Sequence, residues 1–141
     1  MPKCALFDDF LASKDTLRVY KEGRLLFASS KGRLAPLLEY IDRLVPHQKN
    51  VTVFDRIVGN AAALLLKKAL CSRAYSPLGS ELAAKTLSNY RIEYHFTEIV
   101  PYIQNSTRED MCPMEKLSLG KNHEEFFELA SKLYGYSVRG N

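Results

Sequence analysis

The sequence predicts a single α/β domain built on a mixed β-sheet with helices on both faces. Its 141 residues, 46% of them apolar, suit one domain with one sizeable core. Short β-rich segments alternate with helical segments along most of the chain, which favours parallel strands joined by right-handed crossovers. A β-hairpin near the N-terminus adds antiparallel pairing, so we expect the sheet to be mixed.

The first elements follow from the spacing of apolar residues. Residues 3–13 carry a helical apolar stripe, and the runs at 16–20 and 25–28 flank a turn at Glu22-Gly23, as in a hairpin. The polar segment that follows can cap a helix over about 34–43, because Pro36 is tolerated in a first helical turn. The N-terminal order is therefore helix, strand, strand, helix.

The pattern in the middle of the chain predicts a strand followed by a largely buried helix. Residues 51–54 are β-rich and end at Asp55, and residues 57–70 are apolar on nearly every helical face. The other predicted elements are a strand at 73–76, a helix entered through 77–80 and running over 82–90, a strand at 92–96 and a final helix at about 123–134.

Composition indicates a soluble, cytoplasmic protein. The N-terminus lacks the apolar core of a signal peptide, and no stretch reaches the ~18 uncharged apolar residues of a membrane span. The cysteines, Cys4, Cys71 and Cys112, are odd in number and widely spaced, which suits reduced thiols better than a disulfide framework. We therefore expect one domain over residues 1–141 with no membrane partner.

Charge is unevenly distributed along the chain. Residues 1–73 contain 13 Lys/Arg and 7 Asp/Glu, whereas residues 74–141 contain 7 and 9. A basic half could favour an anionic ligand or RNA, but the sequence has no run of basic residues and no aromatic-basic ribonucleoprotein motif. A solvated basic face is the preferred interpretation, with RNA binding as a weaker alternative.

Three segments together carry a family resemblance: the hairpin, the run VFDRIVGNAAALLL after a strand, and MCPMEK near the C-terminus. From about Leu17 to Lys116 the chain resembles the domain-of-unknown-function family 1893, which is classed with the cytidine-deaminase-like fold. The resemblance implies a three-layer α/β/α sandwich with a five-stranded sheet. It also implies a pocket at the carboxyl ends of the central strands, where helix N-termini and loops converge.

The same resemblance contradicts zinc chemistry. Zinc deaminases take a His or Cys ligand and a Glu proton shuttle from one helix and two Cys from a P-C-x-x-C segment. The corresponding segments here read GRLAP and FDRIVG, which contain no His, Cys or Glu, and the three histidines have no metal-ligand spacing. We expect no bound zinc and no other cofactor.

If the strands are parallel, residues 29–36, 55–60 and 112–116 should meet at one edge of the sheet. Asp55 could contact a ligand or act as a base, and the alternative is an N-cap of the following helix. Gly59 and Asn60 leave room for a ligand, or equally for close packing of that helix. These positions define the predicted site.

Cationic side chains near the same edge are candidate ligand contacts. Arg33 and Arg56 could hold a phosphate or carboxylate at two helix N-termini, although isolated arginines are more often plain surface residues. Lys116 adds a third cation close to Cys112. We therefore expect a small polar or anionic ligand.

Cys112 precedes a proline, which places it at a helix N-cap where the helix dipole favours a thiolate. The alternative is a small apolar residue packed under a loop. Glu115, three residues later, could complete a cap or orient a ligand. Cys112 and Glu115 thus join Asp55 as candidate catalytic residues.

Two main functions remain open. The first is binding of a small polar ligand, including nucleotide-derived ones, without chemistry, and it is preferred because the sequence shows no complete catalytic constellation. The second is a metal-independent enzyme that uses Asp55, Cys112 and Glu115. The sequence fixes neither the oligomeric state nor whether a reaction occurs.

Overall fold

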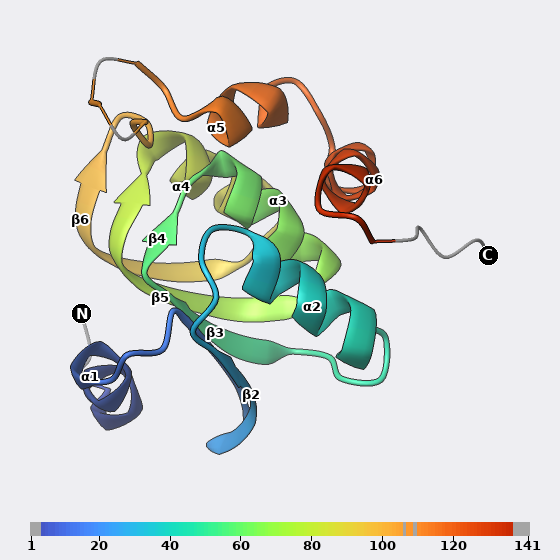
Figure 1. Cartoon of the computed structure of the whole chain (residues 1–141). Helices are drawn as coiled ribbons and strands as arrows, with labels where there is room; N and C mark the ends of the chain where they lie inside the picture. The colour runs from blue at the N-terminus through green and yellow to red at the C-terminus, as the bar shows by residue number, and fades with distance from the viewer. Residues whose placement is uncertain (1–3, 106, 109, 137–141) are drawn as a thin grey trace.

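The computed structural model describes residues 4–105, 107–108 and 110–136, and within them an α/β fold with six helices. Figure 1 shows the path of the chain. The helices are α1 (Ala5–Ala12), α2 (Ala35–Leu44), α3 (Asn60–Lys68), α4 (Glu81–Asn89), α5 (Pro113–Ser118) and α6 (His123–Leu133). The strands are β1 (Leu17–Lys21), β2 (Arg24–Ser29), β3 (Val51–Asp55), β4 (Ile57–Val58), β5 (Cys71–Ser80) and β6 (Glu93–Val100).

The sheet is open and mixed, as expected, and it has six strands within the described residues where the resemblance implied five, because β3 and β4 are separate strands in one position of the sheet. Strand β1 pairs antiparallel with both β2 and β3, while β3, β4 and β6 all run parallel to β5. Strands β3 and β4 lie end to end along one side of β5, because β3 pairs with its first half and β4 with Leu78 and Gly79. The interruption between them falls at Arg56.

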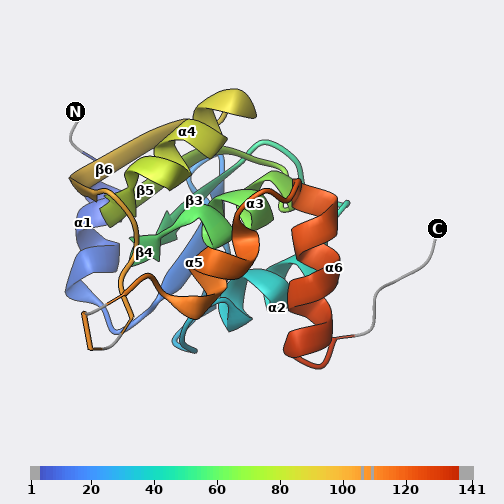
Figure 2. The same cartoon turned by 90° about the horizontal axis from the view of Figure 1, so that it is seen from above.

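Helices cover both faces of the sheet, but unequally. Buried side chains of α2, α3, α4 and α6 form one large core with the sheet, built mainly from leucine, alanine and valine. On the opposite face α1 alone packs Phe7 and Phe10 against Tyr20, Phe54 and Tyr75. Figure 2 shows α1 set apart from α2 and α6. The described residues thus form three layers, the outer one on the α1 side being a single helix.

Alternation along β3 separates the two cores. Val51 and Val53 are buried in the larger core, and Phe54 points into the aromatic cluster under α1. Because side chains alternate along a strand, Asp55 continues on the face of Val53 and Arg56 turns toward α1. This register decides where the two adjacent polar residues point.

Two predicted boundaries were wrong. The helix expected over 57–70 begins only at Asn60, because Ile57 and Val58 pair with β5. The segment 77–80, expected to enter a helix, instead completes β5, which runs for 10 residues and pairs with β6 to its end. Pairing with neighbouring strands outweighs the local turn signals of Pro77 and Gly79. The predicted strand at 73–76 is correspondingly the middle of a longer one.

The remaining helices match the prediction closely, whereas β6 continues to Val100, beyond its predicted end at residue 96, because it pairs with the extended β5. Helix α4 starts after Ser80, whose side chain accepts a hydrogen bond from the amide of Ala83 at 2.9 Å. Helix α6 starts with a capping box between Asn122 and Glu125. Within the described part of the chain, no helix has the length and apolar character needed to cross a membrane.

Candidate functional site

A cavity of about 600 Å³ opens at the carboxyl end of β3. It lies between the start of α2, the start of α3, and α5 with the loop before it. Its polar lining comes from Thr16, Arg33, Asp55, Arg56, Gln104, Asn105, Cys112 and Glu115, and its apolar lining from Leu34, Ile57, Gly59, Ala61, Ala62, Ile103, Pro113 and Met114. The prediction that the three segments meet at one edge is confirmed.

Asp55 is the half-buried carboxyl of this pocket. Burial raises its pKa to about 7, although the backbone amides of Ile57 and Arg56 favour the charged form and partly offset that effect. The alternative role as N-cap of α3 was wrong, because α3 begins at Asn60 with Gly59 at its N-cap. Near neutral pH the carboxyl is therefore divided between its charged and neutral forms, so it can accept or donate a hydrogen bond.

Glu115 has a different environment. Its side chain is only 2% exposed, and its Oε1 accepts hydrogen bonds from the amides of Asn60 at 2.5 Å and Ala61 at 3.3 Å. Its Oε2 accepts one from the amide of Ile103 at 3.1 Å. Glu115 thus caps α3, a helix distant from it in sequence, and fastens the loop before α5 to it. The expected cap exists, but on another helix.

Gly59 leaves the space that Glu115 occupies. A Cβ built at Gly59 would lie 2.6 and 2.8 Å from the two carboxylate oxygens of Glu115, too close for any side chain without rearrangement. Neighbouring Asn60 is buried and does not line the pocket. Its side-chain amide donates to Ser118 Oγ at 2.9 Å, and its Oδ1 accepts from the hydroxyl of Thr86. Asn60 therefore holds α3, α4 and α5 together.

Cys112 lines the pocket and stands at the N-cap of α5, as its proline neighbour predicts. The residue is half-buried, and its amide donates to the carbonyl of Ile103 at 2.8 Å. Lys116, in contrast, lies outside the pocket lining, where its exposed amine pairs with Asp110. The structure brings Cys112 and Asp55 into one cavity without Lys116.

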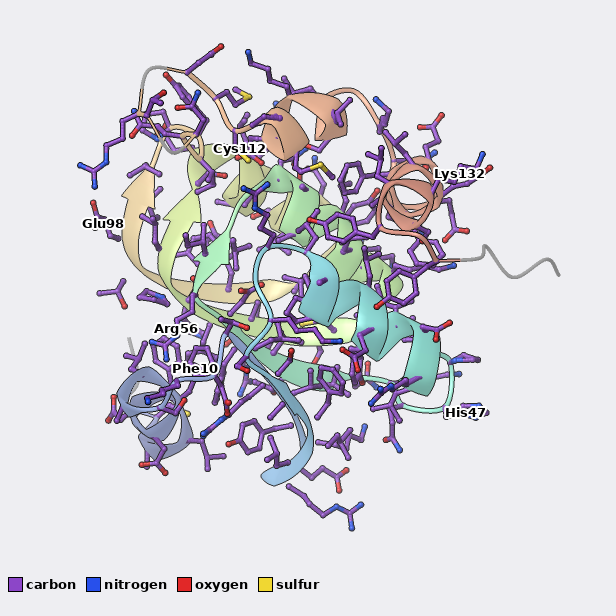
Figure 3. The ribbon with its side chains drawn as sticks, in the orientation of Figure 1. Phe10, His47, Arg56, Glu98, Cys112 and Lys132 are labelled. Atoms are coloured by element: carbon purple, nitrogen blue, oxygen red, sulfur yellow. The ribbon has the colours of Figure 1, made fainter. Side chains whose placement is uncertain are left out.

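The two arginines differ sharply. Arg33 is exposed at the pocket and makes no ion pair with any residue of the described ranges. Arg56 lies over the Phe10 ring, 4.5 Å from its centroid, as the neighbouring labels in Figure 3 show. Its guanidinium donates to four carbonyls at the end of α1 and just beyond, those of Phe10, Leu11, Ser13 and Asp15. Arg56 therefore anchors α1 and has little capacity left for an anion.

Sequence reasoning missed the wall formed by Ile103, Gln104 and Asn105. The irregular segment after β6 carries no periodic pattern, and a bridge between Gln104 and Met111 folds it back toward α5. Thr16 was missed as well, because it was interpreted only as the first residue of the hairpin run. The segment is held by backbone contacts such as the hydrogen bonds of Ile103 with Glu115 and Cys112, and the residue types do not predict these contacts.

Metal and charge patterns add two observations. Among residues 4–105, 107–108 and 110–136, no three His, Cys, Asp or Glu side chains are grouped as a metal site would need. Several basic side chains that could have formed a cationic surface are paired with acids instead, namely those of Arg18, Lys31, Arg43, Lys68 and Arg73. This pairing dilutes the basic character of the N-terminal half.

Comparison with known proteins identifies the family. A model described as TM1506, domain of unknown function (DUF1893), matches residues 7–132. The chain belongs to this family. The crystal structure of a DUF1893 family protein, TM1506 from Thermotoga maritima, is similar to this DUF1893 chain with a TM-score of 0.81 and 27% identity, covering 92% of this chain and 87% of that one. A search of curated proteins found no match.

Proposed function

We propose that this DUF1893 protein binds a small polar ligand in the pocket at the carboxyl edge of its sheet. The main support for this proposal is a cavity of about 600 Å³ that is lined by Asp55, whose pKa is about 7. That volume lies within the range of roughly 300 to 1,000 Å³ typical of small-molecule sites. A carboxyl with a perturbed pKa inside such a cavity is typical of functional sites.

The lining indicates what kind of ligand would fit. Ile57, Ile103 and Met114 offer apolar walls for a flat or compact body, and Asp55 offers a carboxyl that can pair with an N–H group or with a carbonyl. Arg33, which forms no ion pair within the described residues, supplies a cation for an anionic substituent. A nucleotide-derived molecule, with a polar ring and a phosphate, combines these features. In this proposal Gly59 makes room for Glu115 and not for the ligand, and Asn60, Arg56 and Lys116 act only through the surrounding structure.

A cytidine-deaminase-like classification is part of the same proposal. The mixed sheet, the hairpin at one edge and the pocket at the ends of parallel strands agree with that fold. A cytoplasmic location agrees with the three cysteines, all of which are free within the described residues.

The test is a thermal-shift screen of nucleosides, nucleotides and amino acids. A ligand present at 100 times its Kd should stabilise the protein by about 2.7 kcal/mol. Asp55→Asn and Arg33→Ala should weaken binding of any hit, whereas Arg24→Ala, which removes an exposed arginine from β2, should not. If hits stabilise all four proteins equally, the ligand binds elsewhere and the proposed site is wrong.

A metal-independent enzyme is the second candidate, because Cys112 and Asp55 line the same cavity. A thiol nucleophile and a carboxyl of near-neutral pKa could perform covalent or acid-base chemistry on a bound ligand. Glu115 would take no part in the reaction and would only hold the start of α3 and the loop before α5 in place. Incubation of each hit with the protein, followed by product analysis, separates the two functions. Cys112→Ser should preserve binding and abolish turnover if the thiol reacts.

An RNA-associated role is the weakest candidate. It rests on the basic excess in residues 1–73, and the ion pairs of that half reduce the charge available to a phosphate backbone. RNA binding that weakens steeply with salt would support this role, whereas salt-insensitive small-molecule binding would support the pocket.

A further inference from the structure

We infer that Glu115 is a built-in anion that occupies the N-terminal amides of α3 and thereby determines which ligand groups the pocket accepts. This inference rests on the proposed function, because it concerns the same cavity. The amides of Asn60, Ala61 and Ile103, defined here as the amide cluster, would otherwise be a positively polarised surface beside the ligand. Glu115 covers that surface from within the protein.

The contacts satisfy the amide cluster completely. Each of its three N–H groups donates to an oxygen of Glu115, at 2.5, 3.3 and 3.1 Å respectively. Two of the donors belong to the first turn of α3, where the helix dipole favours negative charge. The Glu115 side chain is 2% exposed, so water screens this attraction little.

The surrounding structure holds the carboxylate in this position. Because Gly59 has no side chain, the Glu115 carboxylate can approach the first amides of α3; an added Cβ would collide with both carboxylate oxygens. The hydroxyl of Ser118 donates to the Glu115 carbonyl at 2.6 Å, and Asn60 in turn donates to that hydroxyl. The backbone of α5 and the side chain of Glu115 are thus fixed together against α3.

This arrangement sorts ligand groups by charge. An anionic group near α3 would find no free donor in the amide cluster and would face the negative charge of Glu115. Neutral or N–H-bearing groups avoid that repulsion and can pair with Asp55. An anionic substituent is accepted only near Arg33, so the ligand should bind with its hydrogen-bond-donating end toward α3 and its anionic end toward Arg33.

The experiment removes the built-in anion and supplies a free one. Glu115→Ala should lower the Tm, and acetate or formate, which match the lost carboxylate, should restore it in a saturable manner. At ten times the Kd of the anion the expected rise is about 4 °C. Sodium chloride at equal ionic strength should give no comparable rise.

Matched variants make the readout specific. Wild-type protein and Glu115→Gln, in which the side chain still fills the space, should show no extra response to acetate over chloride. Glu98→Ala, which removes an exposed carboxylate from β6, should behave as wild type. A simple structural role for Glu115 would lower the Tm of the alanine variant without making it responsive to small carboxylates.

Two outcomes decide the inference. If acetate and formate act on Glu115→Ala only as chloride does, the amide cluster has no anion affinity and the inference is overturned. If the variant does not fold in buffer, the recovered folded fraction after refolding with acetate or with chloride gives the same comparison. This test uses no pocket ligand, so its outcome is independent of the ligand screen. If acetate stabilises Glu115→Ala but the screen finds no ligand, only the proposed function is contradicted. If the screen finds ligands but acetate does not stabilise Glu115→Ala, only the inference is contradicted.

Discussion

Replacing Asp55 with asparagine should stabilise the protein at neutral and higher pH. The pKa of the carboxyl rises from 3.8 to about 7 on folding, because burial disfavours the charged form. Asparagine keeps the shape and an acceptor oxygen for the amides of Arg56 and Ile57, but it never ionises. The cost of placing a charge in the pocket therefore disappears in Asp55→Asn.

The sign and size follow from proton linkage. Below pH ~4 the carboxyl is neutral in both folded and unfolded protein, so it contributes no pH dependence. Between about pH 4 and 7 only the unfolded chain releases the proton, so wild-type stability falls as pH rises. The full effect above pH 7 is at most about 4 kcal/mol, at ~1.4 kcal/mol per pKa unit. Because the pocket is open to water, we expect about 2 kcal/mol.

Urea unfolding of wild type and Asp55→Asn between pH 4 and 8.5 measures this difference directly. The stability of the variant relative to wild type should grow through the window from pH 4 to 7 and then level off. Asp9→Asn, which removes an exposed carboxylate from α1, shows whether loss of any negative charge has the same effect. Parallel profiles for wild type and Asp55→Asn would refute the reasoning that burial holds the proton on Asp55.

Three further predictions concern other residues of the site. Gly59→Ala should destabilise the protein by about 1 to 3 kcal/mol in urea unfolding, because the new Cβ would overlap the buried carboxylate of Glu115. Gly32→Ala, with open space around it, should change the stability by less than about 0.5 kcal/mol. Equal effects of the two substitutions would contradict the crowding at Gly59. Arg56→Ala should accelerate amide hydrogen exchange in α1, since four carbonyls lose a donor, and unchanged exchange there would show that α1 is held by its aromatic contacts alone. Cys112 should be alkylated fastest of the three thiols in folded protein, as measured by peptide mapping, because burial raises the pKa of Cys71 to about 12, and faster reaction at Cys4 or Cys71 would remove the main support for a thiol enzyme.

Local patterns were enough to predict most elements of the fold. The β-rich run at 51–54 and the helical stripe of α2 depend on neighbours in sequence, so the spacing of their apolar residues is sufficient to identify them. The same is true of Cys112 at an N-cap, which follows from Pro113 alone. The meeting of Asp55, Gly59 and Cys112 in one pocket followed from parallel strands, whose carboxyl ends share an edge.

The parts that sequence could not predict depend on partners far away in the chain. Whether 57–58 begins a helix or pairs as a strand is decided by β5, and β5 extends to Ser80 because β6 pairs with it up to that residue. Gly59 and Glu115 belong to distant segments of the sequence, yet one must lack a side chain for the other to fit.

The α/β class, the order of elements and the edge of the sheet at which polar residues gather can be predicted from the sequence, because they follow from local periodicity and the handedness of strand connections. The role of each polar residue at that edge depends on the tertiary structure. Alternation along β3 and the break after it leave Asp55 in the pocket and turn Arg56 to α1. Glu115 reaches α3 because α5 packs against it. A carboxylate or guanidinium pairs with whichever groups the fold brings within hydrogen-bond distance, and here those groups come from segments that are distant in the sequence.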